Sequence, residues 1–384
     1  MNLQLILLYI LHIFNDGYQA AFLILLPFIA KDLHINLTQV GSLGSVIYIM
    51  EMVFSLPAGY LASRFDGLKI LTVLMFLFGI GFSGLFFTSS LSTLLFPFLF
   101  VGVAYGIFHP IGFSLVAKWA KTHTRGRQLG DFTAIGDIGR ITLPAIITYL
   151  VVLIGWKSTS LGFGISAFVL FFIAFMLYHS HKKIQTKVKE EHEHISIFQL
   201  LKNGRYMLAV IASMLDSMSS SSLFIFLPFL LLQKGIASSI LGSFAAAYFV
   251  GNFLGKSVIG RLVDRFGNAR VFISAEILMA VFIVFLTITK SPVFIVIFSL
   301  MVGALTKGTV PARTSMGIDA LEGHKRFEKA IGLSAFFITA GGSLAPLIYG
   351  RIADIWGINA TFYTSACIAL LAIIPAIVFS LVKK

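Results

Sequence analysis

Charged side chains are scarce in this sequence, and cysteine is almost absent. Only 12% of the 384 residues are charged, whereas a soluble domain carries about 25%. The single cysteine, Cys367, excludes an intrachain disulfide and is predicted to be a small buried apolar side chain. No G-x-x-x-x-G-K-[ST] motif occurs, which argues against ATP-driven transport by this chain. Too few polar side chains remain to coat a water-soluble globule, so no soluble catalytic domain is expected.

Hydrophobic residues make up 58% of the chain. They fall in blocks that reach or approach the roughly 20 residues that a helix needs to cross a bilayer. Because a lipid-exposed backbone must satisfy its own hydrogen bonds, these blocks are expected to be helical. The sequence therefore predicts an all-α membrane protein with twelve transmembrane helices, at about residues 4–30, 38–62, 69–88, 92–117, 129–153, 158–179, 206–232, 238–262, 270–289, 292–315, 329–350 and 359–381.

The lysines and arginines indicate the orientation. An even number of spans places both termini on one side. If that side is cytoplasmic, the outside loops hold only Lys31, Lys157, Lys234, Lys290 and Arg351, whereas the inside loops and the C-terminal tail hold most of the rest. The pattern predicts a multi-pass protein of a bacterial inner membrane with both termini in the cytoplasm.

The net charge of +13 follows this loop pattern, so no nucleic-acid partner is expected. The expected partners are the lipid bilayer, protons and a small-molecule substrate, and the chain is expected to be monomeric. The most polar stretch, 181–205, is interpreted as a solvated cytoplasmic linker. A metal-binding interpretation of His179, His181, His192 and His194 is the alternative, and we favour the linker, with no metal or cofactor.

The linker separates two six-helix halves, 1–180 and 206–384, which align at a constant offset of 201 residues. Leu26-Pro27-Phe28 then matches Leu227-Pro228-Phe229, and Gly102 and Pro110 match Gly303 and Pro311. Six helices per repeat give both copies the same orientation. Parallel repeats of this kind describe the halves of major facilitator transporters, whose substrate site lies between the halves near the midplane.

The loop motifs carry the same resemblance. Gly260-Arg261-Leu262-Val263-Asp264-Arg265-Phe266-Gly267 resembles the major facilitator signature G-x-L-x-D-R-x-G, and the first half repeats it around Arg64 with Ser63 in place of the acid. The resemblance implies that Gly260, Asp264, Arg265 and Arg64 form a structural gate that braces the cytoplasmic side. In addition, the runs His12-Ile13-Phe14-Asn15-Asp16 and Phe108-His109-Pro110 resemble motifs of the fosmidomycin-resistance branch, which implies export.

Ionisable side chains at membrane depth are costly, about 2.5–3.5 kcal/mol each on insertion scales, and therefore point to function. His12, Asn15, Asp16 and Gln19 follow the spacing i, i+3, i+4, i+7, which places them on one face of the first helix. Asp16 falls near mid-bilayer. We predict that Asp16 carries the coupling proton with the help of His12, while Asn15 and Gln19 contact substrate. A static polar clamp between helices is the alternative.

Asp137 and Arg140 lie three residues apart and so share one face of the fifth helix. The fork of Arg140 suits a carboxylate or phosphonate, which predicts a substrate contact; a purely structural pair is the alternative. His109 and Asp216 are further candidates for proton coupling, and Lys307, Glu51 and Lys256 for substrate binding. Asp131 and Glu276, near helix ends, are instead expected to meet loop arginines such as Arg265 or Arg270.

Together these features predict a proton-coupled secondary transporter, not an enzyme. Export of a small anionic or zwitterionic organic molecule by alternating access is the first expectation. Import of an anionic nutrient is the second, and it is favoured by Arg140, Lys256 and Lys307. A membrane enzyme or receptor on a transporter scaffold is a third and weaker alternative.

Overall fold

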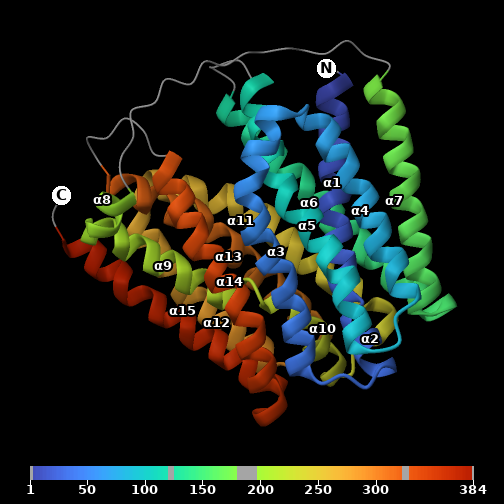
Figure 1. Ribbon diagram of the computed structural model, residues 1–384. Helices are drawn as coiled ribbons and strands as arrows, with labels where there is room; N and C mark the ends of the chain where they lie inside the picture. Colours follow the sequence, from blue (N-terminus) through green and yellow to red (C-terminus); the bar gives the residue numbers. More distant parts are fainter. Residues whose placement is uncertain (1–2, 120–124, 180–196, 322–327, 383–384) are drawn as a thin grey trace. The chain divides into compact units, whose positions relative to one another are not determined.

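The computed structural model describes residues 3–119, 125–179, 197–321 and 328–382, and in these residues the regular elements are helices (Figure 1). Within these described residues, twelve stretches are long and apolar enough to span a membrane, as the sequence predicts. The first and seventh spans each join two α-helices, and the eighth joins a short 3₁₀ helix to an α-helix. The elements are α1 (Leu3–Ile24), α2 (Leu26–Asp32), α3 (Leu37–Arg64), α4 (Gly67–Phe86), α5 (Leu91–Trp119), α6 (Arg125–Ile154), α7 (Trp156–His179), α8 (Ile197–Lys202), α9 (Gly204–Ser220), α10 (Leu223–Gln233), the short 3₁₀ helix η2 (Ser238–Ile240), α11 (Leu241–Phe266), α12 (Asn268–Ile288), α13 (Pro292–Asp319), α14 (Glu328–Trp356) and α15 (Ile358–Leu381).

The chain divides into two compact units. One contains residues 1–188 and 237–246, and the other contains 189–236 and 247–384. Most of the predicted linker, including His181, His192 and His194, lies outside the described residues, while His179 ends α7.

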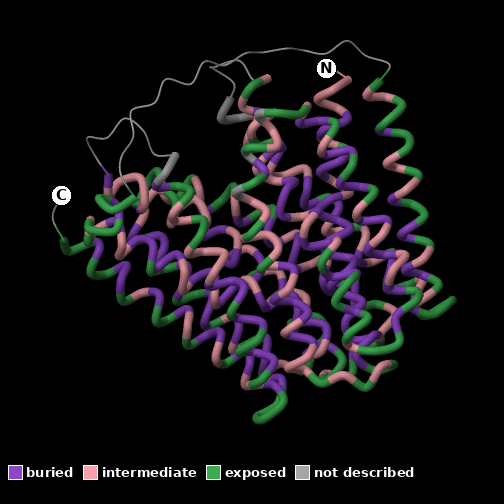
Figure 2. The backbone as a smooth tube through the Cα atoms, viewed as in Figure 1, coloured by how far each residue is buried: buried purple, intermediate pink, exposed green. Residues whose placement is uncertain are grey.

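The first unit is built around α1. This helix packs on α6, while α4 packs on α5 and α7. Most of α1 is buried, as the purple colour shows along it (Figure 2). The buried part includes its polar residues His12, Asn15, Asp16 and Gln19. Polar groups in such a position must find partners inside the protein, because neither water nor lipid reaches them.

The second unit repeats these pairings. Here α9 packs on α14, as α1 packs on α6 in the first unit. Similarly, α12 packs on α13 and α15, as α4 packs on α5 and α7. The turns before the last helix of each unit also match, because Gly155 (φ 78°) and Gly357 (φ 84°) both adopt a left-handed conformation that favours glycine. The two-repeat arrangement predicted from the offset of 201 residues therefore fits the structure.

Local sequence signals explain several helix starts. Asn36 and Gln39 form a reciprocal capping box at the start of α3, with both hydrogen bonds 2.9 Å long. Asp66 caps α4 by accepting from the backbone amides of Leu68 and Lys69. Asp66, which lies just after Arg64 of the first loop motif, is thus a helix cap.

The residues of the predicted gate lie at helix ends. Arg64, Asp264 and Arg265 are exposed, and the Arg64 guanidinium lies 4.7 Å from the centre of the Tyr60 ring. A Cβ at Gly260 would meet one atom within 4 Å, on Pro311. The bracing role of these residues stays a prediction.

One expectation about α15 is wrong. Cys367 is exposed, not buried. The sequence shows that it lies in an apolar block but not which face of the helix it occupies.

Candidate functional site

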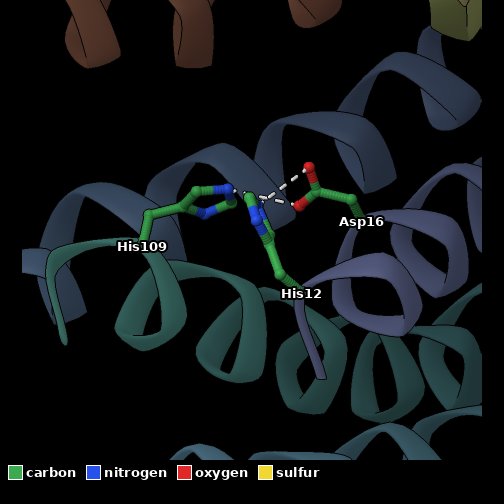
Figure 3. Close-up of side chains that lie close together, drawn as sticks. All are labelled: His12, Asp16 and His109. Atoms are coloured by element: carbon green, nitrogen blue, oxygen red, sulfur yellow. Dashed lines mark ion pairs between the residues drawn. The ribbon is translucent and has the colours of Figure 1, made fainter. Parts of the chain in front are cut away.

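Asp16 is the centre of a buried polar cluster in the first unit. Its side chain is 2% exposed, and three elements supply its partners. Nε2 of His109 lies 3.2 Å from Oδ1, and Nε2 of His12 lies 3.3 Å from Oδ2; both rings point toward the carboxylate (Figure 3). The Asn15 amide also donates to Oδ1 at 3.0 Å. From α6, Nη2 of Arg140 reaches Oδ2 at 2.8 Å.

Arg140 ties two acids together. Besides Asp16, its Nη1 donates to Oδ1 of Asp137 at 3.0 Å, and its Nη2 donates to the Tyr105 hydroxyl at 3.0 Å. Asp137 is fully buried and the Arg140 side chain is 11% exposed. Charge-assisted hydrogen bonds of this kind are about twice as strong as neutral ones. The guanidinium is therefore held firmly while both acids are ionised.

Glycines bring α1 and α6 close enough for these contacts. A Cβ on Gly139 would collide with the backbone of Ile13, and a Cβ on Gly17 would lie 2.9 Å from the backbone of Gly139. A Cβ on Gly136 would overlap Oδ2 of Asp16. Gly136 and Gly139, which lie beside Asp137 and Arg140, thus allow the close approach of the two helices.

The two histidines differ in their surroundings. His12 is buried, and its ring stacks on Phe132 at 4.0 Å and on Phe108 at 5.5 Å between centroids. The His109 side chain is 23% exposed. Two carboxylates against one guanidinium leave one negative charge in the cluster, which a proton on either histidine would balance. His109 is the better placed of the two to exchange that proton with water.

His12, Asp16 and His109 also present metal-type ligands, with their ligand atoms within 4.8 Å of one another. However, the Arg140 guanidinium lies 2.8 Å from the same carboxylate. A divalent cation would therefore lie against a fixed positive charge. The arrangement fits a proton better than a metal ion.

The structure thus brings together six of the predicted site residues from three separate helices: His12, Asn15, Asp16, His109, Asp137 and Arg140. Gln19 is buried one turn further along α1. Glu51, half-buried on α3, lies within electrostatic range of Tyr105.

The other predicted residues belong to the second unit. Lys256 on α11 and Lys307 on α13 are half-buried there. Asp216 is fully buried on α9, where it forms an ion pair with Arg313 and accepts a hydrogen bond from Thr309 at 2.9 Å.

Sequence reasoning missed three residues of these clusters. Tyr105 is one turn before His109 on α5, and this spacing was the available signal. Arg313 lies within the predicted span 292–315, and this position at membrane depth was the available signal. Glu276 was expected to meet Arg265 or Arg270 and this is wrong: it is fully buried beside Asp216 and Arg313. Its position two turns inside α12 was the signal.

Comparisons with known proteins agree with this architecture. A family model of the Major Facilitator Superfamily matches residues 5–228 and 209–384. An uncharacterised MFS-type transporter of Methanocaldococcus jannaschii is 22% identical over 345 residues, with 89% of each chain covered. A probable L-galactonate transporter of Escherichia coli K12 is 25% identical over 169 residues, which cover 42% of this chain and 36% of that protein.

Solved structures share the fold. A bacterial homolog of the human lysosomal transporter Spinster, in an inward-facing and occupied conformation, aligns with a TM-score of 0.76 at 12% identity, covering 99% of this chain and 96% of that one. A D-xylose-proton symporter aligns with a TM-score of 0.73 at 15% identity, covering 97% and 95%. At these identities the likeness concerns the fold alone.

Proposed function

Because the chain belongs to the major facilitator superfamily, we propose that it is a proton-coupled secondary transporter of a small organic anion. In this proposal the anion binds Arg140 and the coupling proton binds Asp16. The observation that carries the proposal is the 2.8 Å contact between Nη2 of Arg140 and Oδ2 of Asp16. The guanidinium of Arg140 thus contacts Asp16, the acid that would take the proton, and it is also the natural partner of the substrate anion.

The contact links the two ligands. While Asp16 is ionised it occupies the fork of Arg140, and an arriving anion has to compete for it. A proton on Asp16 removes that competitor and leaves Arg140 with a net attraction for an anion. Each ligand therefore favours the binding of the other, and linkage requires the effect to be reciprocal. His109 and His12, both beside the carboxylate, supply and remove the proton.

Positive linkage favours movement of anion and proton in the same direction. With an inward proton gradient this is uptake, the second of the two directions expected from the sequence. Export by antiport, which the fosmidomycin-resistance resemblance implies, needs a proton and a substrate that exclude each other. A cationic substrate that binds the ionised Asp16 would behave in that way. Because the Arg140 guanidinium lies against Asp16, it favours an anionic substrate over a cationic one.

The relatives add support for the substrate class. L-galactonate, after which one relative is named, is a sugar acid with a carboxylate that matches the fork of Arg140. A proton symporter with this fold is among the solved structures. Neither assigns the substrate of this chain.

Proton movement in proteoliposomes tests the proposal. Purified protein is reconstituted with a pH dye inside, and a gradient of a small organic anion is imposed, using L-galactonate, lactate and succinate in turn. D-xylose serves as the neutral control and choline as the cationic one. At least one anion should acidify the interior, and D-xylose should not. Alkalinisation by an inward gradient of choline, with no response to any anion, would instead indicate antiport of a cation.

The setting in the cell is also proposed. The distribution of lysine and arginine favours a bacterial inner membrane, with both termini and the linker 181–205 in the cytoplasm between halves 1–180 and 206–384. The chain is proposed to act as a monomer. Reporter fusions at residues 1, 190 and 384 should all report the cytoplasm, and a periplasmic linker would contradict the topology.

A further inference from the structure

A second buried charge cluster lies in the second unit. Asp216 on α9 forms an ion pair with Arg313 on α13 through Oδ2. Its other oxygen, Oδ1, accepts a hydrogen bond from Thr309 at 2.9 Å. Asp216 is fully buried, and the Arg313 side chain is 13% exposed. Both oxygens of Asp216 are thus satisfied by α13, which is the arrangement of an ionised carboxylate.

Glu276 on α12 adds a second carboxyl to this pair. It is fully buried and faces Asp216 and Arg313. Neither of its oxygens accepts a hydrogen bond from a donor within the described part of the chain. An ionised carboxylate without a donor is among the costliest groups to bury, whereas a protonated carboxyl carries its own donor. The acceptor that Glu276 faces is the Asp216 carboxylate.

Apolar packing surrounds the three charges. Ala212 of α9, Phe272 of α12 and Ala312 of α13 belong to one buried cluster, and the partly buried Leu215 of α9 packs against it. Each lies within one helical turn of Asp216, Glu276 or Arg313 in the sequence. The charges are therefore enclosed by hydrocarbon on the sides where these helices meet, and their balance has to be local.

Within the described residues, the charges that act on Glu276 are those of Asp216 and Arg313. On α15, which packs on α12, the titratable groups Tyr363 and Cys367 are exposed. On α14, which packs on α9, Arg351 and Asp354 are exposed near the C-terminal end. On α13, Lys307 lies about two turns from Arg313. Asp319, on the same helix, accepts a hydrogen bond from the Asn268 amide at 2.6 Å.

We propose that Asp216 and Glu276 hold one proton between them and form a second proton-binding site. One guanidinium neutralises one carboxylate. A second buried negative charge in contact with the first would be repelled by it and poorly solvated, so the pair keeps a proton. The proton belongs to the pair and not to one residue, because the two carboxyls titrate together.

A cavity brings water next to the ion pair. A hollow of about 180 Å³ in the second unit is lined by Arg313 together with the hydroxyl-bearing residues Tyr206, Ser213, Thr314 and Ser334. It is large enough for several water molecules, each of which takes about 30 Å³ in the liquid. Water in this cavity can hydrogen-bond with the hydroxyls and with the guanidinium that pairs with Asp216, so it lies one residue away from the shared proton.

The assignment of this proton to the transport cycle rests on the proposed proton coupling, whereas its presence does not. Infrared spectroscopy reads the proton directly, because the carbonyl stretch of a protonated carboxyl is separate from that of a carboxylate. The full-length protein in detergent at pH 7 is compared in H₂O and D₂O without substrate. The transport test of Asp16→Asn can contradict the proposed coupling while the infrared band is still present. Equally, the band can be absent while the transport test supports the coupling, so the two failures are distinguishable.

The wild type should show the band of a protonated carboxyl at pH 7, and D₂O should shift it because water in the cavity lies next to the ion pair. Glu276→Gln and Asp216→Asn should each abolish it, because the remaining acid then pairs with Arg313 and ionises. Loss in both variants distinguishes a shared proton from one held by an isolated glutamic acid. Asp319→Asn, which removes a carboxylate on α13, the helix that carries Arg313, is the matched control and should retain the band.

Circular dichroism and gel filtration confirm that each variant is folded. Absence of the band in the wild type, or its persistence in a folded Glu276→Gln variant, would overturn the proposal. A band that D₂O does not shift would overturn the access through the cavity. If Glu276→Gln is not folded, Asp216→Asn and Glu276→Asp provide the test, and Glu276→Asp should keep the band.

Discussion

The two halves of this repeat use buried acids in different ways. In the first, Asp16 is surrounded by donors, namely Arg140, two histidines and Asn15. In the second, Asp216 is satisfied by Arg313 and Thr309, and its neighbour is a second acid, Glu276. By the offset of 201 residues Asp216 corresponds to Asn15 and not to Asp16. The comparison teaches that an equivalent backbone position keeps a polar group while the chemistry around it changes.

The difference predicts separate roles. The first cluster holds a guanidinium between two acids and next to titratable histidines, so its charge can be redistributed when an anion arrives. The second encloses two acids and one guanidinium among apolar side chains, so it stores a proton. Four substitutions test the role of the first cluster.

Asp16→Asn should have the largest effect. The amide imitates the protonated acid at nearly equal volume, so Arg140 is always available to the anion. Accumulation driven by a pH gradient should be lost, while exchange of labelled for unlabelled anion continues. Allosteric couplings of this type usually amount to about 5–150-fold. If the variant still accumulates anion with a proton gradient as the sole driving force, Asp16 is not the coupling residue.

Arg140→Lys should weaken anion binding by about tenfold, or 1.4 kcal/mol. Lysine keeps the charge but loses the planar fork that bridges Asp16, Asp137 and an incoming carboxylate. Calorimetric titration with the active anion measures the affinity, and thermal unfolding measures stability. Arg270→Lys, an exposed arginine on α12, is the control. Unchanged affinity with reduced stability would mean that the Arg140–Asp137 pair is structural.

Gly136→Ala should destabilise the protein by about 1–3 kcal/mol, as over-packing does. The new Cβ would overlap Oδ2 of Asp16, so α1 has to move away from α6 and transport should fall as well. Gly130→Ala on the same helix is the matched control, because a Cβ there meets nothing within 4 Å. Equal thermal stability of the two variants would contradict the close contact between the helices.

His12→Ala should have the smallest effect of the four. His109 remains beside Asp16 and is the more exposed proton donor, so transport should continue with its pH optimum displaced by about one unit. The pH profile of anion-driven proton uptake measures this. Complete loss of activity in a folded variant would assign the proton pathway to His12.

The sequence was sufficient to predict the spans and the repeat, because membrane length and loop charge leave strong local signals. It also placed His12, Asn15 and Asp16 on one face and paired Asp137 with Arg140, since both inferences need nothing beyond helical spacing. It did not show that Arg140 contacts Asp16, because α1 and α6 are more than 100 residues apart in the chain. The same limit hid the meeting of Asp216, Glu276 and Arg313 from three helices, and with it the true partner of Glu276.

Proton uptake on anion binding tests the central claim most directly. Isothermal titration of the purified protein near neutral pH, in two buffers with different ionisation enthalpies, measures the protons exchanged when the anion binds. The account predicts that wild-type protein takes up a proton as the anion binds, and that Asp16→Asn binds the same anion without uptake. Proton release by the wild type, or equal uptake by Asp16→Asn, would contradict the linkage of proton and anion through Arg140.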